Sequence, residues 1–94
     1  MLFGGIDSGS LTTEAVIMSG GEVLSYSIVP TGASNRTAAR RAWDEALRSA
    51  GVKAEDVTLV VATGCGRESI EFAEVTVTEI TCHARGARRV FPTA

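Results

Sequence analysis

The chain has 94 residues, of which 45% are hydrophobic and 21% charged, and its net charge is −2. This length suits one small domain or part of a larger one, and the composition is that of a folded globular protein. The small net charge gives no indication of a nucleic-acid or anionic membrane partner. No apolar run approaches the roughly 20 residues of a membrane-spanning helix, and the first residues do not resemble a signal peptide.

The cysteine and histidine content argues against a metal centre within this chain. Cys65 and Cys82 are too far apart for a C-x-x-C unit, and His83 is the only histidine. A site with four protein ligands is hard to build from this set. Two free thiols without an export signal predict a cytoplasmic protein.

An apolar start leads into a short run of glycines and hydroxyl residues, residues 4–13 (GGIDSGSLTT). Glycines let backbone N–H groups approach an anion closely, and hydroxyl groups add donors without bulk. Asp7 suits a hydrated Mg²⁺, which prefers one or two carboxylates together with substrate phosphates. The run therefore predicts a phosphate-binding turn, with an ordinary Gly/Ser turn capped by the aspartate as the alternative.

The stretch after this turn distinguishes between kinds of phosphate loop. Residues 13–18 and 23–29 are β-prone and flank a Gly-Gly pair, a pattern typical of a β-hairpin. A Walker loop or a dinucleotide-binding turn would continue into a helix, and the Walker lysine is missing, since Lys53 is the only lysine. Together with residues 2–6, the pattern predicts three antiparallel strands whose first turn holds phosphate.

An amphipathic helix is predicted after these strands. Ser34 or Asn35 can cap its beginning, Gly51 suits its end, and apolar residues recur three and four apart between them. Trp43 lies on the apolar side of this helix, and we expect it to anchor the helix on the sheet.

The rest of the chain predicts one buried strand and a second helix. Residues 57–62 form a nearly continuous apolar run, typical of a buried strand, which ends in a turn at residues 63–67 (TGCGR). A short strand near 75–77 and a helix over about 78–90 follow. The order β-β-β-α-β-(β)-α predicts an α/β fold with a mixed sheet and two main helices.

Three segments resemble the motifs of one branch of the superfamily of acetate and sugar kinases, heat-shock chaperones and actin. Residues 5–13 are similar to its first phosphate motif, residues 61–67 (VATGCGR) to an A-T-G-x-G-R turn, and residues 77–87 (VTEITCHARGA) to an E-I-x-C-H-A-x-G-A helix. The branch comprises ATP-dependent activators of 2-hydroxyacyl-CoA dehydratases and the ATP-binding subunits of benzoyl-CoA reductase. The resemblance implies a ribonuclease H-like, actin-like ATPase half-domain, with residues 1–94 as a single partial N-terminal subdomain.

The resemblance also implies roles for individual residues. Asp7 would organise Mg²⁺ on the phosphates as a catalytic and metal-binding residue, and Glu79 would position the attacking water in phosphoryl transfer. The structural alternatives are turn capping for Asp7 and stabilisation of a helix N-terminus for Glu79. The expected donors to the β- or γ-phosphate are Ser8, Gly9, Ser10, Thr12 and Thr13.

Two positions depart from the family pattern. Cys65 stands where the branch usually has an aromatic residue, and Glu14 stands where the family commonly has a lysine. A carboxylate repels phosphate where a cation would attract it, unless the side chain turns away or binds metal.

The implied function is that of the N-terminal ATP-binding segment of an activator. The whole protein would couple ATP hydrolysis to electron transfer to a CoA-ester dehydratase or reductase component. Because the resemblance covers only the first third or so of such a protein, the isolated chain is expected to bind ATP and Mg²⁺ weakly or not at all and to be inactive. The [4Fe-4S] cluster of full-length members would find its ligands outside this chain.

Two other interpretations stay open. The chain could be a non-catalytic module derived from the same fold, which self-associates through an open sheet edge into a dimer or another homo-oligomer. A sugar-kinase-like N-terminal lobe is the weaker alternative, since it shares the first motif but not the histidine-containing helix.

Overall fold

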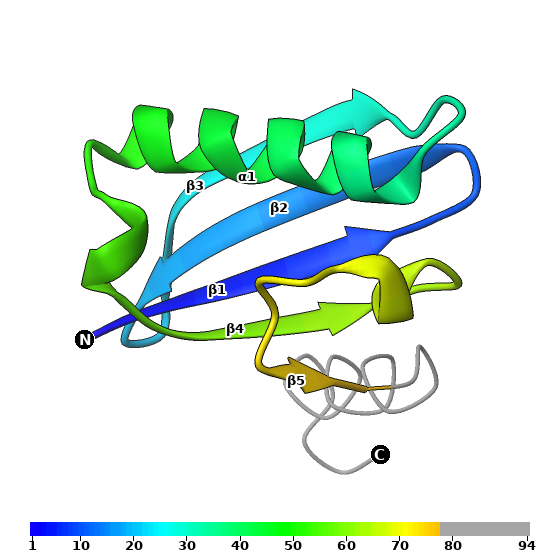
Figure 1. Cartoon of the computed structure of the whole chain (residues 1–94). Helices are drawn as coiled ribbons and strands as arrows, with labels where there is room; N and C mark the ends of the chain where they lie inside the picture. Colours follow the sequence, from blue (N-terminus) through cyan, green and yellow to red (C-terminus); the bar gives the residue numbers. More distant parts are fainter. Residues whose placement is uncertain (78–94) are drawn as a thin grey trace, which may run out of the picture.

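The computed structural model describes residues 1–77, which form a five-stranded mixed sheet with an α-helix across one face (Figure 1). The order β3-β2-β1-β4-β5 places three antiparallel strands beside two that pair in parallel, as predicted.

The predicted second helix lies outside the described residues. Within residues 1–77, no helix is long and apolar enough to cross a membrane. The elements are β1 (Leu2–Ser8), β2 (Thr12–Ser19), β3 (Glu22–Pro30), α1 (Asn35–Ala50), η1 (Ala54–Asp56), β4 (Val57–Thr63), η2 (Arg67–Ser69) and β5 (Val75–Thr76).

Local capping signals determine where α1 begins and ends. The Ser34 hydroxyl accepts a hydrogen bond from the Thr37 N–H at 3.2 Å, so Ser34 is the N-cap. At the other end, Gly51 has a φ of 71°, the left-handed conformation that glycine adopts without strain. The Val52 N–H then donates to the Leu47 carbonyl at 3.2 Å, which closes the last turn.

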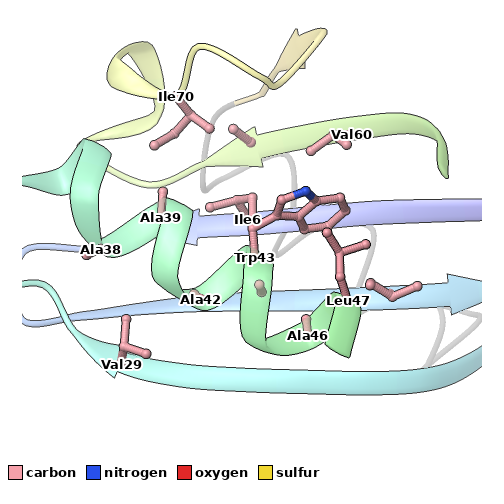
Figure 2. Close-up of a cluster of buried hydrophobic side chains, with 13 residues drawn as sticks. Ile6, Val29, Ala38, Ala39, Ala42, Trp43, Ala46, Leu47, Val60 and Ile70 are labelled. Carbon is pink, nitrogen blue, oxygen red and sulfur yellow. The ribbon is translucent and has the colours of Figure 1, made fainter. Parts of the chain in front are cut away.

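The core lies between α1 and one face of the sheet. Trp43 is 2% exposed and lies in the middle of this core, with Ile6, Val60 and Leu47 around it (Figure 2). The strand beneath the ring has a glycine, Gly4, where any Cβ would collide with the indole. The expected anchoring role of Trp43 is therefore confirmed, and its fit depends on a small residue in β1.

Two serines on the covered face of β3 also attach α1 to the sheet. The Ser25 hydroxyl donates to the Ala46 carbonyl at 2.7 Å, and the Ser27 hydroxyl donates to the Ala42 carbonyl. Buried hydroxyl groups need such partners, because an unpaired polar group is costly in a dry interior. The pairing lets a strand with polar residues on its inner face pack directly against the helix.

Three turns meet at one end of the sheet. Strands β1, β3 and β4 all run in the same direction, so the turns that follow them lie at the same edge (Figure 1). These turns span residues 9–11, 31–34 and 64–66. Residues far apart in the sequence thus surround the predicted phosphate-binding turn.

Candidate functional site

The turn between β1 and β2 is shorter than the sequence predicted. The β1–β2 ladder continues through the pairs Asp7–Glu14 and Ser8–Thr13, so only residues 9–11, here called the β1–β2 turn, lie outside the strands. Aspartate, serine and glycine favour turns in isolation, which explains the earlier predicted end of the strand at residue 6. In the fold, pairing with Glu14 and the β-branched Thr13 of β2 extends the strand.

Four carbonyl oxygens around the β1–β2 turn, those of residues 8, 9, 11 and 12, accept hydrogen bonds within the protein. By contrast, the N–H groups of Ser10 and Leu11 donate to no backbone carbonyl within residues 1–77. Within residues 1–77 the Ser10 carbonyl also accepts no hydrogen bond, but the other backbone groups that the turn leaves free are donors, which suits an anion. The four contacts that engage the carbonyls are Thr31 Oγ1 to Gly9 O (2.8 Å), Thr31 N to Leu11 O (2.9 Å), Gly66 N to Ser8 O (2.9 Å) and Gly9 N to Thr12 O (3.1 Å).

The five predicted phosphate donors lie together but divide into two groups. Ser10 and Thr12 are exposed and Gly9 is partly exposed, so a ligand can reach them. Ser8 and Thr13 are 0% exposed, because their side chains lie on the face of the sheet that α1 covers. The Ser8 hydroxyl has no hydrogen-bond partner among the described residues, whereas the Thr13 hydroxyl lies 2.8 Å from that of Thr31.

Two hollows adjoin the β1–β2 turn, and Asp7 lines both. One, of about 380 Å³, is formed by the turn itself together with Cys65. The other, of about 430 Å³, opens on the face of the sheet opposite α1, where Glu14 and Thr63 lie beside Asp7 among apolar residues. A phosphate on the turn would therefore have Asp7 beside it and an apolar surface next to it.

Asp7 faces a second carboxylate directly. The sheet register pairs it with Glu14 on one side and with Thr63 on the other, and both carboxylate residues are exposed. Like charges opposite each other in a sheet destabilise it unless something compensates. Among residues 1–77, no group of three or more His, Cys, Asp and Glu residues could hold a metal ion. A magnesium ion at Asp7 would therefore need water and phosphate oxygens as its other ligands.

The turn after β4 approaches the end of β1 so closely that it requires glycine. Gly64 has a φ of 93°, and a Cβ there would lie 2.7 Å from Asp7 Oδ1 and would collide with the Ser8 carbonyl oxygen. A Cβ at Gly66 would lie 2.5 Å from Ser8 Oγ and 2.5 Å from Asn35 Cγ. The two glycines of residues 63–67 thus allow this turn to support the β1–β2 turn. The sequence alone identified residues 63–67 as a motif but gave no physical reason for its two glycines.

Sequence reasoning missed Thr31, which is 6% exposed and contacts the β1–β2 turn through both its N–H and its hydroxyl. The sequence predicted no role for its segment, which lies between β3 and α1. The available signal was a polar residue directly after a strand that ends at the same edge of the sheet as β1. Glu79, the other predicted catalytic residue, lies outside the described residues.

Comparisons with known proteins agree with this geometry. The sequence profile of the BadF/BadG/BcrA/BcrD ATPase family matches residues 5–94. The chain is 38% identical over 91 residues to the activator of lactoyl-CoA dehydratase from Anaerotignum propionicum, an alignment that covers 96% of this chain and 35% of that protein.

Two solved structures have the same fold. One is component A of the (R)-2-hydroxyglutaryl-CoA dehydratase from Acidaminococcus fermentans, with a TM-score of 0.89 and 35% identity over 98% of this chain and 36% of that one. The other is the activator of the 2-hydroxyisocaproyl-CoA dehydratase from Clostridium difficile with bound ADPNP, with a TM-score of 0.83 and 31% identity over 94% and 33%. The chain therefore spans about a third of the length of these relatives. Its architecture is that of a half-domain of the actin-like ATPase fold.

Proposed function

Because the chain belongs to the BadF/BadG/BcrA/BcrD ATPase family, we propose that it is the N-terminal ATP-binding segment of an activator of a CoA-ester dehydratase or reductase. In the whole protein, ATP hydrolysis would be coupled to electron transfer to that component. Relatives that are named as dehydratase activators, one of them solved with bound ADPNP, support this proposal. Since the chain spans about a third of them, its own part would be one wall of the nucleotide site.

The observation that carries the proposal is the donor surface of the β1–β2 turn. The carbonyls of residues 8, 9, 11 and 12 all accept hydrogen bonds from the protein, while the N–H groups of Ser10 and Leu11 have no backbone acceptor within residues 1–77. These two N–H groups are therefore available to a ligand. A phosphate group does need converging donors, and Ser10 and Thr12 add exposed hydroxyl groups to them.

The side chains present fit a magnesium–nucleotide complex. Asp7 would hold a water molecule of Mg²⁺, and the buried Thr63 hydroxyl beside it has no partner among the described residues. The ion would supply neutralisation of the phosphate charge. Glu14 lies directly across from Asp7, and its negative charge opposes phosphate binding. We therefore propose that the affinity for ATP is low without Mg²⁺.

The catalytic part of the proposal depends on residues beyond this wall. Glu79 would position the attacking water, and the ligands of a [4Fe-4S] cluster would come from outside the chain. The isolated chain would then bind Mg·ATP weakly and would not hydrolyse it. A partner dehydratase or reductase, a cytoplasmic location and a single partial subdomain over residues 1–94 belong to the same proposal.

A chimera tests this function. Residues 1–94 would replace the matching third of the Acidaminococcus fermentans activator, and Mg·ATP binding and activation of the dehydratase would be measured. We expect the chimera to bind Mg·ATP and to lose both properties by at least about tenfold on Asp7→Asn, since that change removes the charge that holds the ion. Asp44→Asn, the same change on the exposed face of α1, is the control and should have no effect.

The outcome of the chimera experiment is interpretable only for a folded protein, so circular dichroism and thermal unfolding would accompany it. A folded chimera that does not bind Mg·ATP would contradict the proposal. So would equal behaviour of the Asp7→Asn and Asp44→Asn variants, because the carboxylate at the turn would then have no special role.

A further inference from the structure

Thr31 joins three parts of the site that are far apart in the sequence. Its hydroxyl lies 2.8 Å from the Gly9 carbonyl and 2.8 Å from the Thr13 hydroxyl, and its N–H donates to the Leu11 carbonyl at 2.9 Å. Thr31 and Thr13 are 6% and 0% exposed, so water does not replace these contacts easily. Two of the carbonyls that would otherwise be free to face a ligand therefore depend on one residue.

The direction of these hydrogen bonds follows from the number of protons. A threonine hydroxyl has a single hydrogen to donate, and the Gly9 carbonyl can only accept. The Thr31 hydrogen therefore goes to Gly9 O, and the Thr13 hydroxyl must donate to Thr31 Oγ1. The proton of Thr13 is then used inside the protein, so this hydroxyl cannot also donate to a phosphate.

We propose that Thr31 is a positioning residue for nucleotide phosphate, and that Thr13 acts through it. By holding the Gly9 carbonyl toward the interior, Thr31 keeps the Ser10 N–H, which belongs to the same planar peptide unit, facing outward. Its contact with the Leu11 carbonyl fixes the other end of the turn. This inference rests on the proposed function for the identity of the ligand. The hydrogen-bond chain itself does not depend on any ligand, and this allows the two to be tested separately.

Three variants isolate the Thr31 hydroxyl. Thr31→Val keeps a similar shape and the backbone N–H but removes the hydroxyl, whereas Thr31→Ser keeps the hydroxyl. Ser25→Ala is the matched control, since Ser25 is also buried on the β3 side of α1 and donates to a carbonyl, that of Ala46, at 2.7 Å. A second hydroxyl-free variant, Thr31→Ala, serves if Thr31→Val does not fold.

The first readout is hydrogen exchange of the Gly9 N–H, which closes the β1–β2 turn on the Thr12 carbonyl. In the intact protein, we expect exchange roughly fivefold faster in Thr31→Val, because the Gly9 carbonyl loses its hydrogen-bond donor and with it its fixed orientation. Thr31→Ser and Ser25→Ala should exchange like the unmodified protein. Unchanged exchange in Thr31→Val, or equal acceleration in Ser25→Ala, would overturn the positioning role.

The second readout is affinity for Mg·ATP, measured by calorimetry on the intact protein. We expect about a tenfold loss in Thr31→Val, rescue in Thr31→Ser and no loss in Ser25→Ala. Faster exchange with unchanged affinity would overturn a role of Thr31 in nucleotide binding. If the unmodified protein does not bind Mg·ATP, the proposed function fails, while the exchange data still decide whether Thr31 orients the turn.

Discussion

Asp7 and Glu14 set the charge at the candidate site. Their positions face each other across the β1–β2 ladder, and both residues line the hollow on the open face of the sheet. Asp7 suits a magnesium ion, but Glu14 adds a second negative charge directly across the ladder from it. In an exposed location, such a charge contributes on the order of 1 kcal/mol.

Glu14→Lys should therefore strengthen nucleotide binding. Replacing a repulsive charge by an attractive one is expected to raise the affinity for Mg·ATP by about fivefold or more, and the gain should shrink at high salt. The control is Glu22→Lys, which makes the same charge change at the far end of the sheet, at the beginning of β3. Calorimetric titration of both variants measures the effect, and equal affinities would show that Glu14 does not face the phosphate.

Individual site residues were predictable only where their role is local. Asp7, Ser10 and Thr12 were predicted as site residues because glycine, hydroxyl and carboxylate groups are concentrated in one short run. Thr31 was not found, since its contacts reach Gly9 across 22 positions and depend on the strand order. No spacing pattern in a single sequence reports such a contact.

At the scale of elements, the turn after β4 supports the β1–β2 turn from the other side. The Gly66 N–H donates to the Ser8 carbonyl at 2.9 Å, and the space at Gly66 is filled by Ser8 and Asn35. The position therefore has no room for a side chain. The start of α1, the end of β1 and this turn are held together by close packing.

Gly66→Ala should displace this packing. We expect the free energy of unfolding to fall by about 1–3 kcal/mol, because the added methyl group forces the Ser8 or Asn35 side chain to move. Gly21→Ala is the control, since a Cβ there meets nothing within 4 Å. Urea denaturation of both variants measures the difference, and an equal loss of stability would contradict the close approach that the structure shows.

Most elements could be predicted because their signals lie within a few residues. The N-cap Ser34, the C-terminal Gly51 and the buried face around Trp43 follow from capping chemistry and helical periodicity, and all three are confirmed. The strand ends at residues 7–8 and 12 could not be predicted in this way, because ladder pairing overrides the turn preference of the local sequence. The short helix η2 had no periodic signal to report it.

At the scale of the whole molecule, the two faces of the sheet differ. Helix α1 covers one face, while the other carries the apolar hollow beside Asp7 and exposed side chains on the edge strand β3, among them Leu24, Tyr26 and Ile28. The homo-oligomer expected from the sequence stays a prediction: light scattering should give a mass above that of one chain, and a monomer would contradict it. The motif order was enough to predict the family, since it combines three separate segments.

In the proposed function, the β1–β2 turn binds the phosphates of a nucleotide. The most direct measurement is an NMR titration of the chain with Mg·ATP, which follows each backbone amide. We predict weak binding in which the amides of Ser10 and Leu11 shift most, while those of the β2–β3 hairpin at Gly20 and Gly21 stay unchanged. Shifts of a folded chain that are confined to other regions would contradict this binding site.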